Sequence, residues 1–167
     1  KVVLLDDKSA DGLDLNGIVT LASIIERETK DDEERPIVAG ILLRRLKAGW
    51  PLQTDATVQY AIASAKCLPS SATPQALQAG QVLNAKCQNW WESLAQKDLE
   101  INSPYNTYKF KGLPPSPIAN PGLSSIKAMI YPQDSIYWFY LHDNEGKIHY
   151  ARTLEGHNQN IKLFLGK

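Results

Sequence analysis

The most constraining feature of this sequence is an apolar run, Leu21–Thr29 (LASIIERET), that ends in two closely spaced carboxylates. Apolar residues recur here at helical spacing, so we expect a helix from about Gly17 to Lys30. Its buried stripe is expected to comprise Ile18, Leu21, Ala22 and Ile25. A helix with such a stripe must be covered by other elements, and it therefore predicts the centre of a globular core.

The two carboxylates of this run, Glu26 and Glu28, project from opposite flanks of the stripe at about 100° per residue. Periodicity alone does not choose between them. Glu26 has Lys30 four residues later, the favourable order for a solvated ion pair, whereas Glu28 has Asp31 and Asp32 at the neighbouring positions. Like charges raise a carboxyl pKa, and this favours Glu28 weakly as the reactive group.

The composition limits the class of protein. The chain has 167 residues, 43 % of them hydrophobic, which fits a single globular domain. Lys plus Arg (18) balance Asp plus Glu (18), so attraction to nucleic acid or anionic lipid is not expected. No apolar run approaches the length of about 20 residues that a membrane span requires. Because the sequence begins with Lys1, we expect it to be a soluble part of a longer chain.

The remaining patterns predict an α+β fold that is mainly helical, with a small antiparallel β component. A second helix starts in the acidic stretch 31–36 and runs to about Lys47, and Thr54 or Asp55 can cap a third. Residues 61–98, rich in Ala, Gln and Ser, are interpreted as a helical insertion in a single domain, 1–167. Ser124 or Ser125 caps a short helix, residues 136–152 form a β-hairpin, and Thr153 starts the last helix.

Three features have two interpretations each. Arg44 and Arg45 are interpreted as a solvated edge in preference to a substrate clamp. The pair Trp90-Trp91 is either a sugar-stacking platform or, as is more common, local core or an interface anchor. The proline-rich segment 112–122 suits a groove wall and equally a loop that packs over the core.

Several chemistries find no support in the sequence. No G-x-S-x-G elbow and no phosphate-cradling glycine loop are present, and all histidines lie in the last quarter of the chain. Two cysteines, Cys67 and Cys87, are too few for a zinc site and form either a disulfide or two inert thiols. A helical Glu beside an apolar stripe is compatible with sugar cleavage, in which a carboxylic acid of raised pKa protonates the glycosidic oxygen.

Four segments, in the same order along the chain, resemble motifs of the endolytic murein transglycosylase (YceG-like) family. Residues 21–29 resemble ASIIEKET, 52–60 resemble LQTDPTVxY, 103–108 resemble PYNTY, and 112–122 resemble GLPPGPIxNPG. The stretch 125–128 and the ending with His149, His157 and Asn158 are also similar to family segments. The departures are Ala56 for Pro, Ser116 for Gly, Gly156 for Glu, and the insertion.

This resemblance implies a role for each matching residue. Glu28 would be the catalytic acid and then base, with Glu26 as its support. His149, His157 and Asn158 are interpreted as structural. The residues implied to line the substrate groove are Gln53, Thr54, Asp55, Tyr105, Asn106 and Asn120.

The resemblance also implies an activity and a setting. Family enzymes cleave the MurNAc–GlcNAc β-1,4 bond of peptidoglycan and leave 1,6-anhydro ends, which terminates or releases nascent glycan. The sugar's own 6-hydroxyl attacks, so no second carboxylate is needed to activate water, and no cofactor or metal is implied. The implied partners are glycan strands and cell-wall synthases, for a monomer at the outer face of the cytoplasmic membrane with a missing N-terminal anchor.

That extracytoplasmic setting favours a Cys67–Cys87 disulfide. Two alternatives to the lytic activity stay open. One is a lysozyme-like hydrolase, and the other is a non-catalytic module that binds peptidoglycan or acts as a scaffold.

Overall fold

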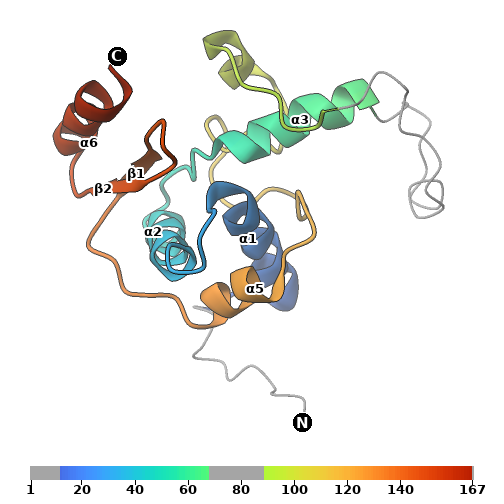
Figure 1. Cartoon of the computed structure of the whole chain (residues 1–167). Helices are drawn as coiled ribbons and strands as arrows, with labels where there is room; N and C mark the ends of the chain where they lie inside the picture. The colour runs from blue at the N-terminus through green and yellow to red at the C-terminus, as the bar shows by residue number, and fades with distance from the viewer. Residues whose placement is uncertain (1–11, 68–88, 167) are drawn as a thin grey trace.

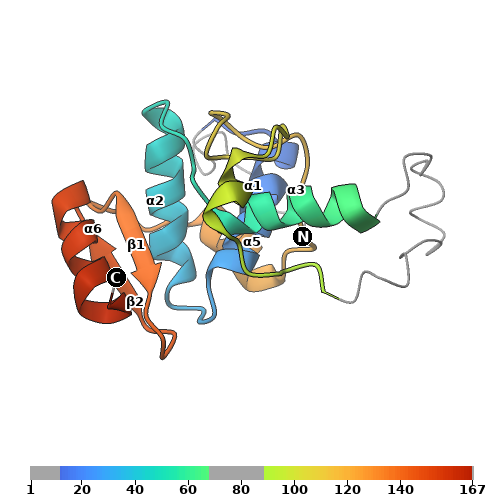
Figure 2. The same cartoon turned by 90° about the horizontal axis from the view of Figure 1, so that it is seen from above.

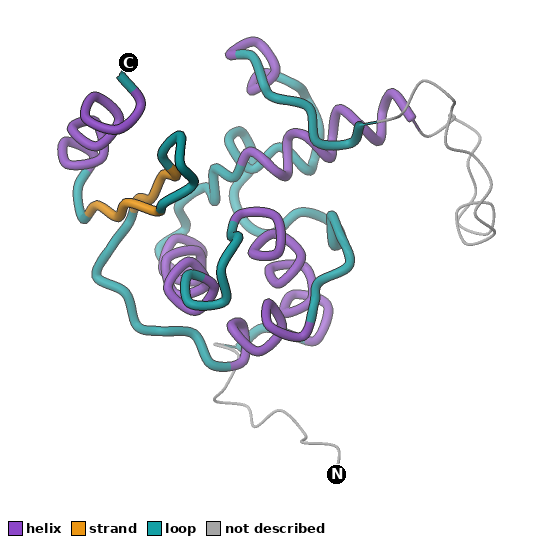
Figure 3. Tube along the Cα trace, in the orientation of Figure 1, coloured by secondary structure: helices purple, strands orange, loops and turns teal. Residues whose placement is uncertain are grey.

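The computed structural model describes residues 12–67 and 89–166, and in these ranges the chain is mainly helical with one antiparallel strand pair (Figures 1 and 3). The predicted α+β class is confirmed. The elements are α1 Leu15–Glu28, α2 Arg35–Lys47, α3 Asp55–Cys67, the 3₁₀-helix η1 Gln96–Glu100, α5 Leu123–Ile130, β1 Phe139–His142, β2 Ile148–Ala151, α6 Leu154–Asn160 and the π-helical turn η2 Ile161–Leu165.

Helix α1 is the centre of the hydrophobic core. Asp14 caps its start, because its Oδ1 accepts a hydrogen bond from the Gly17 N–H at 2.7 Å. The helix ends at Glu28, where the Thr29 hydroxyl donates to the Ile25 carbonyl at 2.8 Å. Both ends lie earlier than the sequence pattern predicted. The whole predicted stripe is buried, together with Ile24.

Helices α1, α2 and α5 pack against one another as the main helical group, seen at the lower centre of Figure 1. The Glu26 carboxylate joins α1 to the start of α5: its Oε2 accepts hydrogen bonds from the Gly122 N–H at 2.9 Å and the Ser125 hydroxyl at 2.7 Å. Gly122 is the N-cap of α5, so the prediction of a serine cap was wrong. Glu26 satisfies the helix start in its place.

Three buried threonines fix the start of α3 against the loop that contains residues 103–108. The Thr107 hydroxyl lies 2.8 Å from that of Thr57 and 3.2 Å from that of Thr54, and it also accepts the Thr54 N–H at 3.1 Å. From this anchor α3 runs outward from the helical group, as Figure 2 shows. The anchor places the first residue of α3, Asp55, next to the C-terminal end of α1.

The predicted β-hairpin is confirmed, with Phe139 opposite Ala151 and His142 opposite Ile148. Thr153 then caps α6, because its hydroxyl accepts the Gly156 N–H at 3.1 Å, also as predicted. Helix α6 packs on both strands, so the hairpin carries it to one side of the helical group (Figure 1).

The proline-rich segment 112–122 packs over α1. Ile118 is only 4 % exposed, and its N–H donates to the Ser23 hydroxyl of α1 at 2.9 Å. This loop therefore covers the core, in agreement with the second of its two interpretations.

The predicted insertion, 61–98, is described only at its two ends. Residues 61–67 continue α3, and residues 89–95 are irregular before η1 begins. Cys67 is disulfide-bonded, whereas Cys87 lies outside the described residues, so the Cys67–Cys87 pairing stays a prediction. Trp91 packs against the core with the Arg27 guanidinium 3.9 Å above its ring, as expected of a core aromatic residue.

Gly40 is required where α2 meets the chain that follows α5. A Cβ atom there would lie 2.0 Å from the Gln133 carbonyl oxygen, a backbone atom held in place because the Gln133 N–H donates to the Pro36 carbonyl at 3.0 Å. Gly40→Ala should therefore lower the free energy of unfolding by about 2 kcal/mol, in spite of the higher helix propensity of alanine. Urea denaturation measures this change.

The matched control is Gly156→Ala in α6, where the nearest atoms to a new Cβ lie at 3.4 and 3.6 Å, ordinary contact distances. There alanine should be neutral or stabilise by up to about 1 kcal/mol. Equal stability of the two variants would contradict the assigned contact.

Candidate active site

A cavity of about 550 Å³ opens beside Glu28, between the helical group and α6. It collects residues from segments far apart in the sequence. The polar and charged residues that line it are Glu28, Arg45, Gln53, Asp55, Tyr108, Tyr140, His142 and His157. The apolar residues are Phe139 and Leu141 from β1, and Leu154, Ile161 and Leu165 from α6 and η2.

Glu28 reaches this cavity because α1 ends there. Its Oε2 accepts a hydrogen bond from the Tyr140 hydroxyl of β1 at 2.7 Å. Desolvation raises the pKa of the Glu28 carboxyl, and the charge of Asp55 raises it further, against the lowering effects of the Tyr140 hydrogen bond, the Ala56 N–H and His142. A carboxyl group in this environment retains its proton to higher pH and can act as a general acid.

The direction of this shift agrees with the sequence prediction, but the predicted cause was wrong. Asp31 and Asp32 were expected to act on Glu28 as neighbours on one helix. The helix ends at Glu28 instead, and Asp32 pairs with Arg35 at 2.7 Å. Burial and the charge of Asp55, from another helix, raise the pKa in their place.

Glu26 has the opposite environment. The Ser125 hydrogen bond lowers the pKa of the Glu26 carboxyl, followed by the Gly122 N–H, with smaller contributions from the positive charges of Arg35 and Arg27. The expected ion pair with Lys30 is replaced by these contacts and by Arg35, 3.9 Å away. Glu26 therefore remains an anion that holds α1 to α5.

Arg45 was predicted to be solvent-exposed, and that prediction was wrong. The residue is only 5 % exposed and lies in the wall of the cavity. Its guanidinium donates to the Leu52 carbonyl and, from Nε at 2.9 Å and Nη2 at 2.6 Å, to the Trp138 carbonyl. These hydrogen bonds join α2, the segment before α3 and the start of the hairpin. Arg44 is exposed, as expected.

Two of the predicted groove residues, Gln53 and Asp55, do line the cavity. Gln53 has a φ of +51°, a left-handed conformation that is unusual for a residue other than glycine and costs of order 1 kcal/mol or more. Asp55 accepts a hydrogen bond from the Tyr108 hydroxyl at 2.6 Å. Burial, together with this hydrogen bond, raises the pKa of Tyr108, so the phenol remains a donor.

The other four predicted groove residues lie elsewhere. Thr54 is buried in the threonine cluster, and Asn106 is fully buried, donating to the Leu99 and Ile101 carbonyls at 2.8 and 2.9 Å. Tyr105 hydrogen-bonds Ser116 at 2.6 Å on another face of α3. Asn120 is exposed and outside the lining of the Glu28 cavity. The proline-rich segment 112–122 contributes no lining residue to this cavity either, so its interpretation as a groove wall is not supported here.

Besides Arg45, four polar residues of the cavity were not predicted to take part: Tyr108, Tyr140, His142 and His157. His142 lies 3.3 Å from a Glu34 oxygen. His157 stacks on Phe139 with ring centroids 5.2 Å apart, and its Nδ1 is buried without a hydrogen-bond partner among the described residues. Burial lowers the pKa of His157, and Arg45 adds to this effect.

The spacing of the strand gave a signal for two of these residues, since Tyr140 and His142 are two positions apart in β1 and therefore share one face. For His157, the signal was the similarity of its segment to the family. His149 forms a local contact with Asp143 at 2.8 Å, consistent with the structural role expected of it, and neither His149 nor Asn158 lines the cavity.

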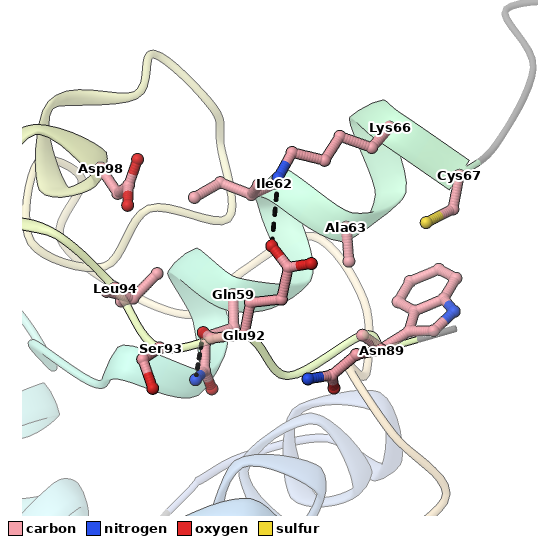
Figure 4. A pocket seen from close by; sticks show the side chains of 11 residues that line it. Gln59, Ile62, Ala63, Lys66, Cys67, Asn89, Glu92, Ser93, Leu94 and Asp98 are labelled. Carbon is pink, nitrogen blue, oxygen red and sulfur yellow. Dashed lines mark hydrogen bonds and ion pairs between the residues drawn. The ribbon is translucent and has the colours of Figure 1, made fainter. Parts of the chain in front are cut away.

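A second cavity, of about 320 Å³, lies between α3 and residues 89–98 (Figure 4). Lys66 and Glu92 form an ion pair of 3.2 Å across it, and Gln59 donates to the Glu92 carbonyl at 2.9 Å. Trp90 lines this cavity and lies 5.8 Å from the ring of Tyr60. The tryptophan pair is thus separate from the Glu28 cavity.

Within residues 12–67 and 89–166, no group of three or more His, Cys, Asp or Glu side chains is arranged as metal ligands. In the same part of the chain, no helix has the length and apolar character of a membrane span.

Comparisons with known proteins give a consistent picture. Residues 4–163 match the profile of the YceG-like family. The chain is 37 % identical over 142 residues to the endolytic murein transglycosylase of Bacillus subtilis, and 31 % identical over 150 residues to that of Streptococcus pneumoniae. A crystal structure of a YceG-like protein from Listeria monocytogenes matches with a TM-score of 0.68 and 36 % identity.

These matches cover most of this chain but a smaller part of the relatives. They include 85 % and 89 % of the chain for the two transglycosylases, which correspond to 32 % and 24 % of their lengths. The match to the Listeria structure covers 87 % of this chain and 39 % of the Listeria chain. The chain therefore spans about a third or less of the two transglycosylases.

The opposite environments of Glu28 and Glu26 predict opposite effects of neutralisation on stability. The folded state favours protonated Glu28. The contribution of this group to the free energy of unfolding is therefore full below the unfolded-state pKa of about 4.3, and it is lost as pH rises through the higher folded pKa. Glu28→Gln should therefore stabilise the protein by about 1 kcal/mol at pH 7, with a smaller gain in acid. Urea denaturation from pH 4 to pH 8 measures both values.

Glu26→Gln is the matched control. In the wild type, the pKa of Glu26 is lowered by folding, so the Glu26 carboxylate stabilises the folded state above about pH 4.3. This stabilisation is lost as pH falls through the folded pKa. This variant should be less stable than the wild type at pH 7 and approach it in acid. Destabilisation by both variants at pH 7 would contradict the assigned environment of Glu28.

Proposed function

This chain belongs to the YceG-like family, and from that premise we propose that it is the catalytic part of a lytic transglycosylase. Its substrate is the glycan strand of peptidoglycan, and the bond that it cleaves is the MurNAc–GlcNAc β-1,4 linkage. The products are strands with 1,6-anhydro-MurNAc ends, and this reaction terminates or releases nascent glycan.

The observation that carries the proposal is the position of Glu28. Its carboxyl opens into a cavity large enough for part of a sugar chain, with a pKa raised mainly by desolvation. The Tyr140 hydroxyl donates to one carboxyl oxygen at 2.7 Å and so orients the carboxyl group in the cavity. A positioned acid of raised pKa is the group that glycosidic cleavage requires.

The reaction runs in two proton transfers at Glu28. In the first, protonated Glu28 gives its proton to the glycosidic O4 of GlcNAc as the C1–O4 bond breaks with both electrons passing to O4. In the second, the MurNAc 6-hydroxyl attacks C1, and its proton passes to the Glu28 carboxylate. The acid is regenerated, and no water enters the products.

The setting is part of the proposal. Transglycosylases of murein act on the cell wall, and two relatives of this chain carry that name. We place the chain at the outer face of the cytoplasmic membrane, where an N-terminal anchor outside this sequence would hold it near cell-wall synthases. An oxidising compartment of this kind suits the disulfide of Cys67.

A lysozyme-like hydrolase is the second candidate, because the cavity also contains a second carboxylate, Asp55. The two reactions differ in their products. Hydrolysis adds water and leaves reducing MurNAc ends, whereas the lytic reaction leaves anhydro ends that are one water lighter.

The test is digestion of purified peptidoglycan by the full-length protein that carries this chain, followed by mass spectrometry of the products. The wild type should give anhydro ends. Glu28→Gln should reduce the rate by at least about 1,000-fold, since the acid is lost while the shape of the side chain is kept. Glycan binding, measured by sedimentation with sacculi, should persist.

Glu26→Gln is the control for this assay, because it neutralises a carboxylate on the same helix outside the cavity and should retain most of the activity. Reducing ends from the wild type would refute the lytic reaction. Full activity of Glu28→Gln would refute the assignment of the acid, and binding without any cleavage by the wild type would indicate a non-catalytic module.

A further inference from the structure

We propose that the cavity between α3 and residues 89–98 is a second glycan-binding site, which holds one GlcNAc ring of the substrate strand against Trp90. The inference rests on the proposed function for the identity of the strand, and it goes beyond that function because cleavage at Glu28 does not require this cavity. Most of its lining residues lie within 61–98, the segment in which this sequence departs from the motifs of the family. We therefore expect relatives without this segment to lack the site.

The side chains that line this cavity suit a sugar. A pyranose ring presents an apolar C–H face that can stack on a flat aromatic side chain, and its hydroxyl and N-acetyl groups need donors and acceptors around the rim. Trp90 provides the aromatic surface. An aromatic wall with a few polar groups is typical of a small-ligand site. The polar residues other than lysine that line the cavity are Gln59, Asn89, Glu92, Ser93 and Asp98.

The charges of the lining favour a neutral ligand. Lys66 contributes one positive charge, whereas Glu92 and Asp98 contribute two negative ones. The Lys66 ammonium lies 3.2 Å from a Glu92 oxygen, so this cation is already paired. A phosphate, a nucleic acid or the carboxylates of a peptide stem would meet an excess of negative charge. In a murein strand the MurNAc rings carry the stems, so the GlcNAc rings are the neutral units that fit.

Trp90 is held in place by aromatic residues that reach the core. Its ring centroid lies 5.8 Å from that of Tyr60, which in turn lies 4.9 Å from the ring of Tyr105. Both tyrosines pack against the hydrophobic core. Trp90 itself stays partly exposed at the cavity, in contrast to its neighbour Trp91, which packs against the core. The indole is therefore fixed and accessible, as a stacking surface must be.

The opposite walls are also fixed before a ligand binds. The Gln59 amide donates to the Glu92 carbonyl at 2.9 Å, and the Lys66–Glu92 ion pair lies one turn and a half further along α3. At the other end, the Ala95 N–H donates to Asp98 Oδ2 at 2.8 Å and so fixes the start of η1. A cavity with hydrogen-bonded walls loses little conformational entropy on binding.

Helix α3 connects this cavity to the one that contains Glu28. Asp55 lines the Glu28 cavity, whereas Gln59, Ile62 and Lys66 line the second one. These four residues follow one another at intervals of four, three and four positions, so they form one stripe along the helix. At the rise of an α-helix, Ile62 lies about 10 Å from Asp55 along the axis. A strand that leaves the first cavity along this stripe therefore reaches the second.

The test measures binding of chitohexaose to the full-length protein that carries this chain. This probe is a neutral β-1,4 oligomer of GlcNAc without peptide stems. Trp90→Ala should raise the Kd by at least about fivefold, because the stacking surface is lost, whereas Trp90→Phe should stay within about twofold of wild type. With peptidoglycan strands as substrate, Trp90→Ala should raise KM by a similar factor with kcat within about twofold, since the lost contact is remote from the bond that breaks.

A direct readout does not depend on the stability of a variant. In protein labelled with fluorotryptophan, the fluorine NMR signal that is absent from Trp90→Phe belongs to Trp90. Chitohexaose should shift this signal in the wild type, with a midpoint that agrees with the Kd.

The matched control is Tyr131→Ala, which removes an aromatic side chain that is 68 % exposed and lies outside the lining of both cavities. It should leave Kd and KM unchanged. A Trp90 signal that does not move at the highest chitohexaose concentration would overturn the proposal. A Trp90→Ala variant with a lower thermal midpoint and a Kd within about twofold of wild type would also overturn it, because Trp90 would then serve packing alone.

These outcomes are distinct from failure of the proposed function. If the wild type releases no anhydro ends but its Trp90 signal moves with chitohexaose, the lytic reaction is refuted and the second glycan site is supported. If the wild type releases anhydro ends and the Trp90 signal does not respond, only the second site is refuted.

Discussion

The geometry of the cavity depends on the buried guanidinium of Arg45. A buried cation is costly unless its donors are satisfied, and here carbonyl groups of two separate segments satisfy them: Leu52 before α3 and Trp138 before β1. These hydrogen bonds set where Gln53 and Asp55 meet the end of α1, and where Tyr140 reaches Glu28. Loss of Arg45 would release both sides of the site at once.

Helical periodicity placed Glu26 and Glu28 on opposite flanks of α1, and that much could be predicted from the sequence. The different environments of the two carboxyl groups depend on which segments pack against each flank. Glu26 meets the start of α5, almost 100 residues later in the chain, and Glu28 meets a strand still further on. The prediction for Arg45 was wrong for the same reason, because the sequence does not show which distant segments pack against a helix. Adjacent arginines differ by about 100° around the helix, and the packed neighbours determine which one is buried.

Local signals predicted the helices and the hairpin well, because both depend on nearby residues. The start of α5 was the exception, since Glu26 of a distant segment satisfies it. The motif residues were harder to assign. Asn106, Thr54 and Tyr105 lie in a recognisable motif or beside one, yet their polar groups bond to the chain itself and hold the loop beside α3. A polar residue in a rigid loop can serve the loop or a ligand, and the sequence does not distinguish these uses.

The last wall of the cavity follows from the hairpin. Helix α6 packs on β1 and β2, so the register that pairs Phe139 with Ala151 also determines where Leu154 and His157 face Glu28. A shift of one residue would turn Tyr140 away from the carboxyl that it binds, since strand side chains alternate between faces. The two short strands thus fix Glu28, through Tyr140, at a set position relative to α6, which forms the opposite wall of the cavity. This is the structural role of the hairpin in a mainly helical protein.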